Sequence, residues 1–257
     1  MRIVALAGCL LVALGACTST SAGSRSIRVG AASSLQDVLP DLADAYARTD
    51  AGVTITLAFD GSSRLRAQIE LGAPADLFLS ADEENVVALA DAGRGSGDPV
   101  AYAGNRIALV VPHIGSAVER WQELAASGTS IVAADEGVPI TRYAEQVVQR
   151  LAARPDAPPG FAEAYRANVV SHEDNVRAAL AKVELGEADA ALVYATDALA
   201  APDVDVVSLP ATDVVAGYWG LALRGAGPNP DARAFLAWLL SPAAQAIFAA
   251  AGFGPPP

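Results

Sequence analysis

Short apolar stretches of strand length alternate with amphipathic stretches of helix length along most of the chain, and this alternation limits the possible folds more than any other feature. Residues 27–32 form an apolar run, and residues 53–59 alternate apolar and polar side chains. Between them, residues 35–48 carry apolar side chains at helical spacing, namely Leu35, Val38, Leu39, Leu42 and Tyr46. Alternating strands and helices predict an α/β fold of mostly parallel sheets flanked by helices.

The alternation continues to the C-terminus, where the final three prolines predict an unstructured end. Further strands are expected at 75–80, 106–112, 204–209 and 218–223, and further helices at 65–71, 83–92, 231–240 and 242–250. The segments that continue the pattern between them are 116–126, 131–134, 143–153, 175–185 and 188–194.

The chain has 257 residues, which is long for one doubly wound sheet, yet no long linker divides it. Two lobes joined by crossing strands fit this length, with crossings expected at 104–106 and 216–219. The first lobe would comprise residues 27–104 plus 217–257. The second lobe, residues 105–216, would be an insertion into the first.

The first 17 residues have the pattern of an export signal. A single positive charge at Arg2 precedes an apolar run, residues 3–14, that is too short to span a membrane comfortably. The run ends in Leu-Gly-Ala-Cys, which resembles the bacterial lipobox, so we expect a lipoprotein-type signal peptide with a lipidated Cys17. Residues 18–26 would be a flexible tether, and the protein would be anchored to the outer face of the cytoplasmic membrane. Ordinary cleavage to a secreted form stays open.

A second lipobox-like tetrapeptide ends at Cys9, but its apolar run is shorter than a signal needs, which favours Cys17. Both cysteines therefore lie in the leader, so the folded part has no disulfide, cysteine metal site or cysteine nucleophile. The net charge of −12 argues against a nucleic-acid partner. It also means that an anion site must rely on local donors, because the long-range field repels anions.

Four predicted junctions place small or hydroxyl residues where a helix follows a strand. The first residues of a helix have unpaired N–H groups and the positive end of the dipole, which together favour an anion. The ligand crevice of an open α/β sheet lies at the carboxyl ends of its strands, where these junctions fall. They predict a shared anion site, although a lone serine before a helix is usually only a cap. The junctions are 31–35, 59–63, 138–141 and 173–176.

The same junctions carry a resemblance to the periplasmic molybdate-binding proteins of ABC importers, and it extends over residues 26–253. The most specific stretch is Gly72–Asp82, which reads GAPADLFLSAD. The other matching segments are VGAASSL at 29–35, FDGSS at 59–63, QIEL at 68–71, VP at 138–139, YA at 143–144, EDNVR at 173–177 and GEADAALVY at 186–194.

The resemblance implies a type II two-lobed binding fold that closes on molybdate or tungstate and delivers it to the membrane permease of an ABC importer. It implies a monomer without enzymatic activity and without a cofactor. Uncharged donors would hold the oxyanion, with no direct bond from protein to metal. Matched by motif, these donors are the hydroxyls of Ser34, Ser62 and Tyr194 and the backbone amides of Ile140 and Val176.

Neighbouring residues leave the register of this donor set open. Ser63 and Asn175 are the alternatives one position along, and Ser33 stands where relatives carry alanine. Relatives also carry alanine-glycine after the proline, where this chain has Ile140 and Thr141. A backbone amide donates whatever its side chain, but isoleucine is bulkier and would narrow the cavity.

Other ligands and a different class of function stay open. A protonated anion such as phosphate needs an acceptor, which Asp60 would supply unless it is a turn aspartate bonded to nearby backbone; sulfate differs from molybdate only in size. A serine hydrolase would need a base beside its nucleophile, and only His113 and His172 are present. Two isolated histidines also argue against an iron or zinc site.

Several charged or aromatic residues near the junctions have simpler interpretations. We expect arginines to be solvated or paired with the many acids, and the aromatic pair at the second crossing to pack at the hinge. Asp135, Asp174 and Asp197 raise the same acceptor question as Asp60, with weaker positional support. The arginines are Arg64, Arg66 and Arg142, and the aromatic pair is Tyr218 and Trp219.

Overall fold

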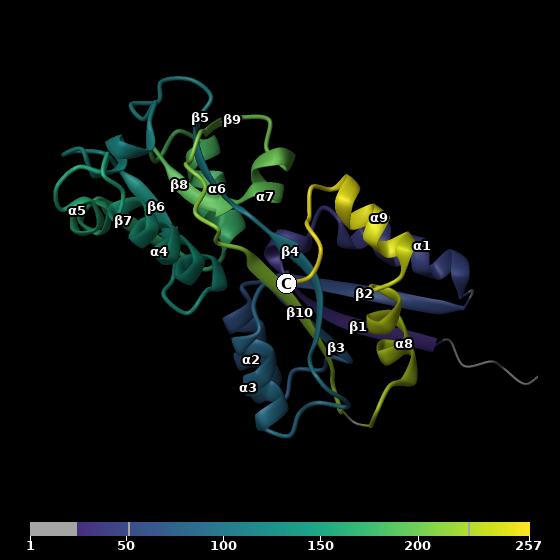
Figure 1. Ribbon diagram of the computed structural model, residues 1–257. Helices are drawn as coiled ribbons and strands as arrows, with labels where there is room; N and C mark the ends of the chain where they lie inside the picture. The colour runs from purple at the N-terminus through teal and green to yellow at the C-terminus, as the bar shows by residue number, and fades with distance from the viewer. Residues whose placement is uncertain (1–24, 51, 226) are drawn as a thin grey trace, which may run out of the picture.

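The computed structural model describes residues 25–257 except residues 51 and 226. The predicted signal peptide, Cys17 and most of the predicted tether lie outside the described residues. The first strand, β1 (Arg25–Ala32), already includes the last two residues assigned to the tether. Figure 1 shows two lobes, with the first and last parts of the chain in one and the middle in the other.

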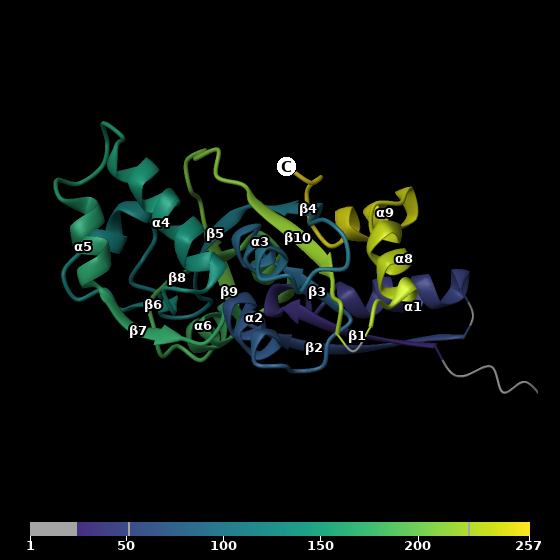
Figure 2. The same ribbon diagram turned by 90° about the horizontal axis from the view of Figure 1, so that it is seen from below.

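A five-stranded sheet with the order β2-β1-β3-β10-β4 forms the first lobe. Strand β1 pairs in parallel with β2 and β3, whereas β10 is antiparallel to both of its neighbours, so four strands share one direction. Helices flank this sheet on both faces (Figure 2). The strands are β2 (Val53–Asp60), β3 (Leu77–Ser80), β4 (Val100–Asn105) and β10 (Ala216–Ala222); the helices are η1 (Ser33–Leu35), α1 (Leu39–Thr49), α2 (Ser62–Glu70), α3 (Glu84–Asp91), α8 (Pro230–Trp238) and α9 (Pro242–Ala250).

The second lobe repeats this arrangement. Strand β5 is antiparallel to β8 and β9, strands β6 and β7 are parallel, and a parallel bridge from Ile131 to Ala190 connects the two groups. The strands are β5 (Ile107–Pro112), β6 (Ile131–Ala134), β7 (Val169–Glu173), β8 (Ala191–Tyr194) and β9 (Val204–Val207); the helices are η2 (Trp121–Ala125), α4 (Pro139–Ala152), α5 (Phe161–Ala167), α6 (Val176–Glu184) and α7 (Ala195–Ala200). The predicted two-lobed α/β fold with mostly parallel sheets is confirmed.

The chain passes between the lobes twice, after β4 and before β10. Strand β4 ends at Asn105 and strand β10 begins at Ala216, and both strands belong to the sheet of the first lobe. Asn105 and Ala216 therefore lie on the first-lobe side of the two crossings. The lobe boundaries at 104/105 and 216/217 remain a prediction. One buried apolar cluster continues across both lobes, from Leu35 in η1 to Val176 in α6, which indicates that the lobes are in contact.

The predicted helix at 35–48 is wrong in its first turn. The chain forms a short 3₁₀ helix over Ser33–Leu35 and then begins α1 at Leu39, with Pro40 in its first turn. Proline has no N–H to donate and is tolerated only at the start of a helix. The helix therefore starts around Pro40, and the serines before it lie in a separate turn.

The C-terminal end is also more ordered than its composition predicts. The backbone of Gly254 exchanges two hydrogen bonds with Gly104, of 2.9 and 2.8 Å. A Cβ at position 104 would lie 2.5 Å from the carbonyl oxygen of Pro255, and one at position 217 would lie 3.0 Å from Pro257. The tail therefore lies against both crossing strands.

No single helix in the described part of the chain is long and apolar enough to cross a membrane. Helices α8 and α9 reach that length and composition only as a pair bent by 62°. Both bury one face in the first lobe, with Phe235 and Phe248 among the fully buried side chains.

Candidate functional site

The four predicted junctions all connect the end of a strand to the start of a helix. In the first lobe, η1 follows β1 and α2 follows β2. In the second lobe, α4 follows β6 and α6 follows β7. A fifth junction, between β8 and α7, has Tyr194 as the residue before the helix.

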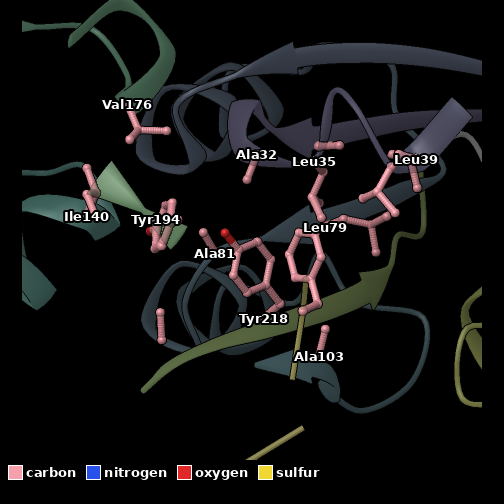
Figure 3. Packing of buried hydrophobic residues seen from close by; sticks show 14 of the residues in the cluster. Ala32, Leu35, Leu39, Leu79, Ala81, Ala103, Ile140, Val176, Tyr194 and Tyr218 are labelled. Carbon is pink, nitrogen blue, oxygen red and sulfur yellow. The ribbon is translucent and has the colours of Figure 1, made fainter. Parts of the chain in front are cut away.

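Three of these junctions meet across the gap between the lobes at Gly61. A Cβ at position 61 would lie 2.7 Å from the carbonyl oxygen of Asp174, 3.6 Å from the Cβ of Asn175 and 3.7 Å from Val138. Figure 3 shows Ile140, Val176 and Tyr194 on one side of this region, opposite Ala32, Ala81 and Tyr218. The lobes therefore adopt a closed arrangement at the carboxyl ends of their strands.

The two candidate serines are both buried, and the Oγ of each already has a hydrogen-bond partner in the protein. The Oγ of Ser62, in the first turn of α2, accepts from the backbone N–H of Ala81 at 3.1 Å. The Oγ of Ser34 lies 2.7 Å from the hydroxyl of Tyr218. The neighbouring Ser63 faces the second lobe, since a Cβ on Gly137 would lie 3.7 Å from its Oγ.

The two candidate amides lie in the first turns of α4 and α6, where the helix itself offers no acceptor. The Asn175 side chain caps α6 by accepting from the N–H groups of Arg177 and Ala178, which leaves Val176 as the amide before them. The residue before α4, Val138, makes no capping bond through its side chain. Each of the two helices therefore has backbone N–H groups available at its N-terminal end.

The hydroxyl of Tyr194 is the clearest sign of a ligand site. The side chain is 1% exposed, and among the described residues its hydroxyl has no hydrogen-bond partner. Burial raises the pKa of this hydroxyl well above its ordinary value, so it stays protonated. A buried, unpaired O–H costs about 1–3 kcal/mol, and an anion bound between the lobes would provide its acceptor.

The arginines near the junctions pair with acids, as predicted. Arg64 of α2 bonds Asp174 in the second lobe, and Arg142 of α4 bonds Asp82 and Glu84 in the first. Arg66 bonds Glu70 one turn along its own helix. A further arginine, Arg177 of α6, lies 3.0 Å from Asp37 and 3.2 Å from Asp197.

Three of the four aspartates considered as acceptors have partners in the protein, namely Asp174, which bonds Arg64, and also Asp60 and Asp197. The Oδ1 of Asp60 accepts from the backbone N–H of Gly61 at 2.7 Å, which is the turn arrangement. Asp197 is buried in α7 beside Arg177. Burial raises the pKa of the Asp197 carboxyl to about 7, against the opposing effect of the Arg177 guanidinium.

Neither candidate serine hydrogen-bonds a histidine within the described ranges. His113 lies 3.1 Å from Asp205 on an exposed surface of the second lobe. His172 lines a cavity of about 450 Å³ between α4, α5 and β7, which shares only Ile140 with the candidate donors. The side chains of residues 25–257, leaving aside positions 51 and 226, include no group of three or more His, Asp or Glu placed to hold a metal ion.

One residue at the site was missed by the sequence analysis. Tyr218 was interpreted as hinge packing, yet its hydroxyl bonds Ser34 and its ring lies 5.6 Å from that of Tyr194. Its partner Ser34 is 184 residues away in sequence, so no local pattern reveals the pair.

Comparison with known proteins agrees with this geometry. Residues 27–254 match the family model described as bacterial extracellular solute-binding protein. This chain belongs to that family.

The similarity to individual relatives extends over most of the chain. The molybdate-binding protein ModA of Mycobacterium tuberculosis (strain H37Rv) is 32% identical over 238 residues, which cover 91% of this chain and 86% of the relative. ModA of Escherichia coli K12 is 32% identical over 236 residues, 88% of each chain. A Bacillus subtilis protein whose name describes an ABC transporter substrate-binding lipoprotein, YvgL, is 31% identical and covers 98% of this chain. The resemblance inferred from the motifs is confirmed.

Solved structures confirm the fold of this solute-binding protein. The periplasmic molybdate-binding protein of Azotobacter vinelandii superposes with a TM-score of 0.75 at 23% identity and covers 90% of this chain. The sulfate-binding protein SubI of M. tuberculosis superposes with a TM-score of 0.78 at 19% identity, also over 90%. Binding proteins for two different tetrahedral oxyanions therefore share this architecture.

Proposed function

We propose that this solute-binding protein captures molybdate or tungstate outside the cytoplasmic membrane and delivers it to the permease of an ABC importer. The observation that carries the proposal is the buried Tyr194 hydroxyl, which has no partner among the described residues and lies where the two lobes meet. The 32% identity to proteins named for molybdate binding supports the choice of ligand.

The proposed donors suit a fully deprotonated oxyanion. Molybdate near pH 7 carries no proton and only accepts hydrogen bonds. The hydroxyls of Ser34, Ser62 and Tyr194 and the amides of Ile140 and Val176 would donate to it. Hydrogen bonds to a charged partner contribute about 1.5–3 kcal/mol each, so five of them support a Kd between roughly micromolar and nanomolar after the costs of association.

The charged groups around the site favour neutral donors over arginine. Arg64, Arg142 and Arg177 are each engaged by carboxylates. The Oδ1 of Asp60 accepts from the backbone N–H of Gly61, so Asp60 has the role of a turn aspartate, which counts against its being the acceptor for a protonated phosphate. The pairing of Ser34 with Tyr218, and of Tyr218 with Tyr194, supports Ser34 over Ser33 as the ligand residue.

We further propose that Cys17 is lipidated and holds the protein on the outer face of the cytoplasmic membrane, and that the protein acts as a monomer. The similarity to a protein whose name describes a lipoprotein supports the anchor. Metabolic labelling with a radioactive fatty acid tests it, because Cys17→Ala should abolish incorporation while Cys9→Ala should not.

Isothermal titration of the protein starting at residue 18 tests the ligand. Molybdate and tungstate should bind with Kd values at least about a hundredfold below those of sulfate and phosphate, a difference of about 2.7 kcal/mol. Sulfate binding as tight as molybdate binding would move the proposal to a sulfate carrier. Tight binding of phosphate without heat from molybdate would overturn it.

A further inference from the structure

The hydroxyl of Tyr218 has two hydrogen-bonding neighbours among the described residues, and together they fix where its proton points. One neighbour is the Oγ of Ser34 at 2.7 Å, and the other is the Nδ2 of Asn105 at 3.4 Å. Tyr218 is fully buried, so its proton needs an acceptor within the protein.

The orientation of the Asn105 amide follows from its other contacts. Its Oδ1 accepts from the backbone N–H of Arg106 at 2.9 Å, and its Nδ2 donates to the Oγ1 of Thr196 at 2.8 Å. The atom that faces Tyr218 is therefore the amide nitrogen, which only donates. The Tyr218 proton has no acceptor there and must be donated to Ser34.

This fixes the proton of Ser34 as well. With one side of its Oγ occupied by the Tyr218 proton, the Ser34 hydroxyl keeps its own proton for another acceptor. Ser62 is in the same state, because its Oγ accepts from the N–H of Ala81 at 3.1 Å. Tyr218 and the backbone of Ala81 thus leave both serines of the proposed site free to donate.

We propose that Tyr218 and Asn105 are positioning residues that lock the Ser34 hydroxyl as a hydrogen-bond donor to the bound oxyanion. This inference rests on the proposed function. Because the Tyr218 proton occupies one side of the Ser34 oxygen, the Ser34 hydroxyl need not reorient to donate when the oxyanion binds.

Burial agrees with this direction of donation. It raises the pKa of the Tyr218 hydroxyl well above its ordinary value, so the group keeps its proton. Asn105 ends β4 and Thr196 lies in α7 of the other lobe. The amide that orients Tyr218 is therefore held at one of the crossings between the lobes.

The test is a double-mutant cycle on molybdate affinity with Ser34→Ala and Tyr218→Phe. Tyr218→Phe should weaken molybdate binding about 3- to 10-fold, the effect of one neutral hydrogen bond. In the Ser34→Ala background the same change should have almost no further effect, because Tyr218 acts through Ser34. Losses that multiply in the double variant would overturn the inference.

The cycle is also the readout that separates positioning from a general loss of packing. A packing defect from Tyr218→Phe would weaken molybdate binding in the Ser34→Ala background as much as in the wild type.

Tyr102→Phe is the matched control, since this tyrosine is fully buried in the same cluster with its ring 6.3 Å from that of Tyr218. Its hydroxyl has no partner within the described part of the chain, and its removal should leave the molybdate affinity unchanged. Asn105→Ala takes the place of Tyr218→Phe in the cycle if that variant does not fold. Absence of molybdate binding in the wild type would overturn the proposed function itself, whereas wild-type binding with multiplying losses overturns only the lock.

Discussion

At the scale of single residues, the proposed site depends on hydroxyl groups whose protons are not used in hydrogen bonds within the protein and are available to a ligand. Ser34 and Ser62 each have an oxygen already engaged by the protein, and Tyr194 has a hydroxyl with no engagement among the described residues. Such groups donate strongly because binding a ligand breaks no hydrogen bond within the protein. In the closed arrangement, the Tyr194 hydroxyl carries the cost of being unpaired until an acceptor binds.

Tyr194→Phe should therefore separate affinity from stability. Molybdate affinity should fall about 10- to 100-fold, the effect of one hydrogen bond to a charged ligand. The midpoint of thermal unfolding without ligand should not fall, because the hydroxyl makes no hydrogen bond to the described residues. Titration calorimetry and a thermal melt on the same sample measure both. Unchanged affinity would remove Tyr194 from the site.

The sequence predicts residue types at the site better than their partners. Ser34, Ser62 and Tyr194 stand in local motifs at strand ends, so a motif comparison finds them. Tyr218 is in no such motif, and its bond to Ser34 joins the first and last parts of the chain. The choice between the adjacent hydroxyls of Ser33 and Ser34 depends on this contact with Tyr218, which is distant in sequence.

At the scale of elements, the junctions where a helix follows a strand were predicted well, since small and capping residues mark them locally, but the helices expected from 65 and 143 begin at Ser62 and Pro139. Short elements were missed, including β4, α5 and α7. Strand β4 ends in Ala-Gly-Asn and has little apolar alternation. Strand β4 forms because β10, more than a hundred residues later, pairs with it. The residues next to β4 in the sequence do not reveal that partner.

Asn175→Ala tests whether, at the start of α6, the Asn175 side chain caps the helix while the Val176 amide binds the ligand. The Asn175 side chain accepts from Arg177 and Ala178, so its loss should destabilise the protein by about 1 kcal/mol, the usual value of a helix cap. Molybdate affinity should change by less than about threefold, or about 0.6 kcal/mol, because the proposed donor is the amide of Val176.

Ser241→Ala serves as the matched control, because Ser241 caps α9 in the first lobe through a single bond to Ala244. It should lower stability by a similar amount without touching affinity. If Asn175→Ala lowered affinity as much as Tyr194→Phe, the Asn175 side chain would itself be a ligand donor, through its Nδ2.

At the scale of the whole molecule, the two lobes arrange their strands in the same way, because the bridge from Ile131 to Ala190 joins the two sheets of the second lobe. Each lobe includes one antiparallel strand next to a crossing. The closed lobes are bridged by ion pairs of Arg64, Arg142 and Arg177. Arg64 and Asp174 are about half exposed, and exposed pairs contribute little, about 0–1 kcal/mol each. The Arg64–Asp174 pair therefore contributes little to closure, and a bound ligand favours closure through bonds made only in the closed state.

Gly61→Ala should block that closure without harming either lobe. The backbone of Gly61 has φ −59° and ψ 136°, which alanine adopts freely. In the closed arrangement its Cβ would lie 2.7 Å from the carbonyl oxygen of Asp174 in the opposite lobe, and backbone atoms cannot give way cheaply. An overpacked contact costs about 1–3 kcal/mol, so molybdate affinity should fall about 5- to 150-fold.

Gly137→Ala is the matched control at the same interface, because its Cβ would have ordinary contacts, at 3.7 Å from Ser63. It should bind molybdate within about twofold of the wild type, or about 0.4 kcal/mol. Small-angle scattering with saturating molybdate should show Gly61→Ala more extended than Gly137→Ala, while both melt at the wild-type temperature without ligand. Wild-type affinity in Gly61→Ala would mean that the anion is bound without the close approach of the lobes at Asp174, and closure would then not be the step that completes the site.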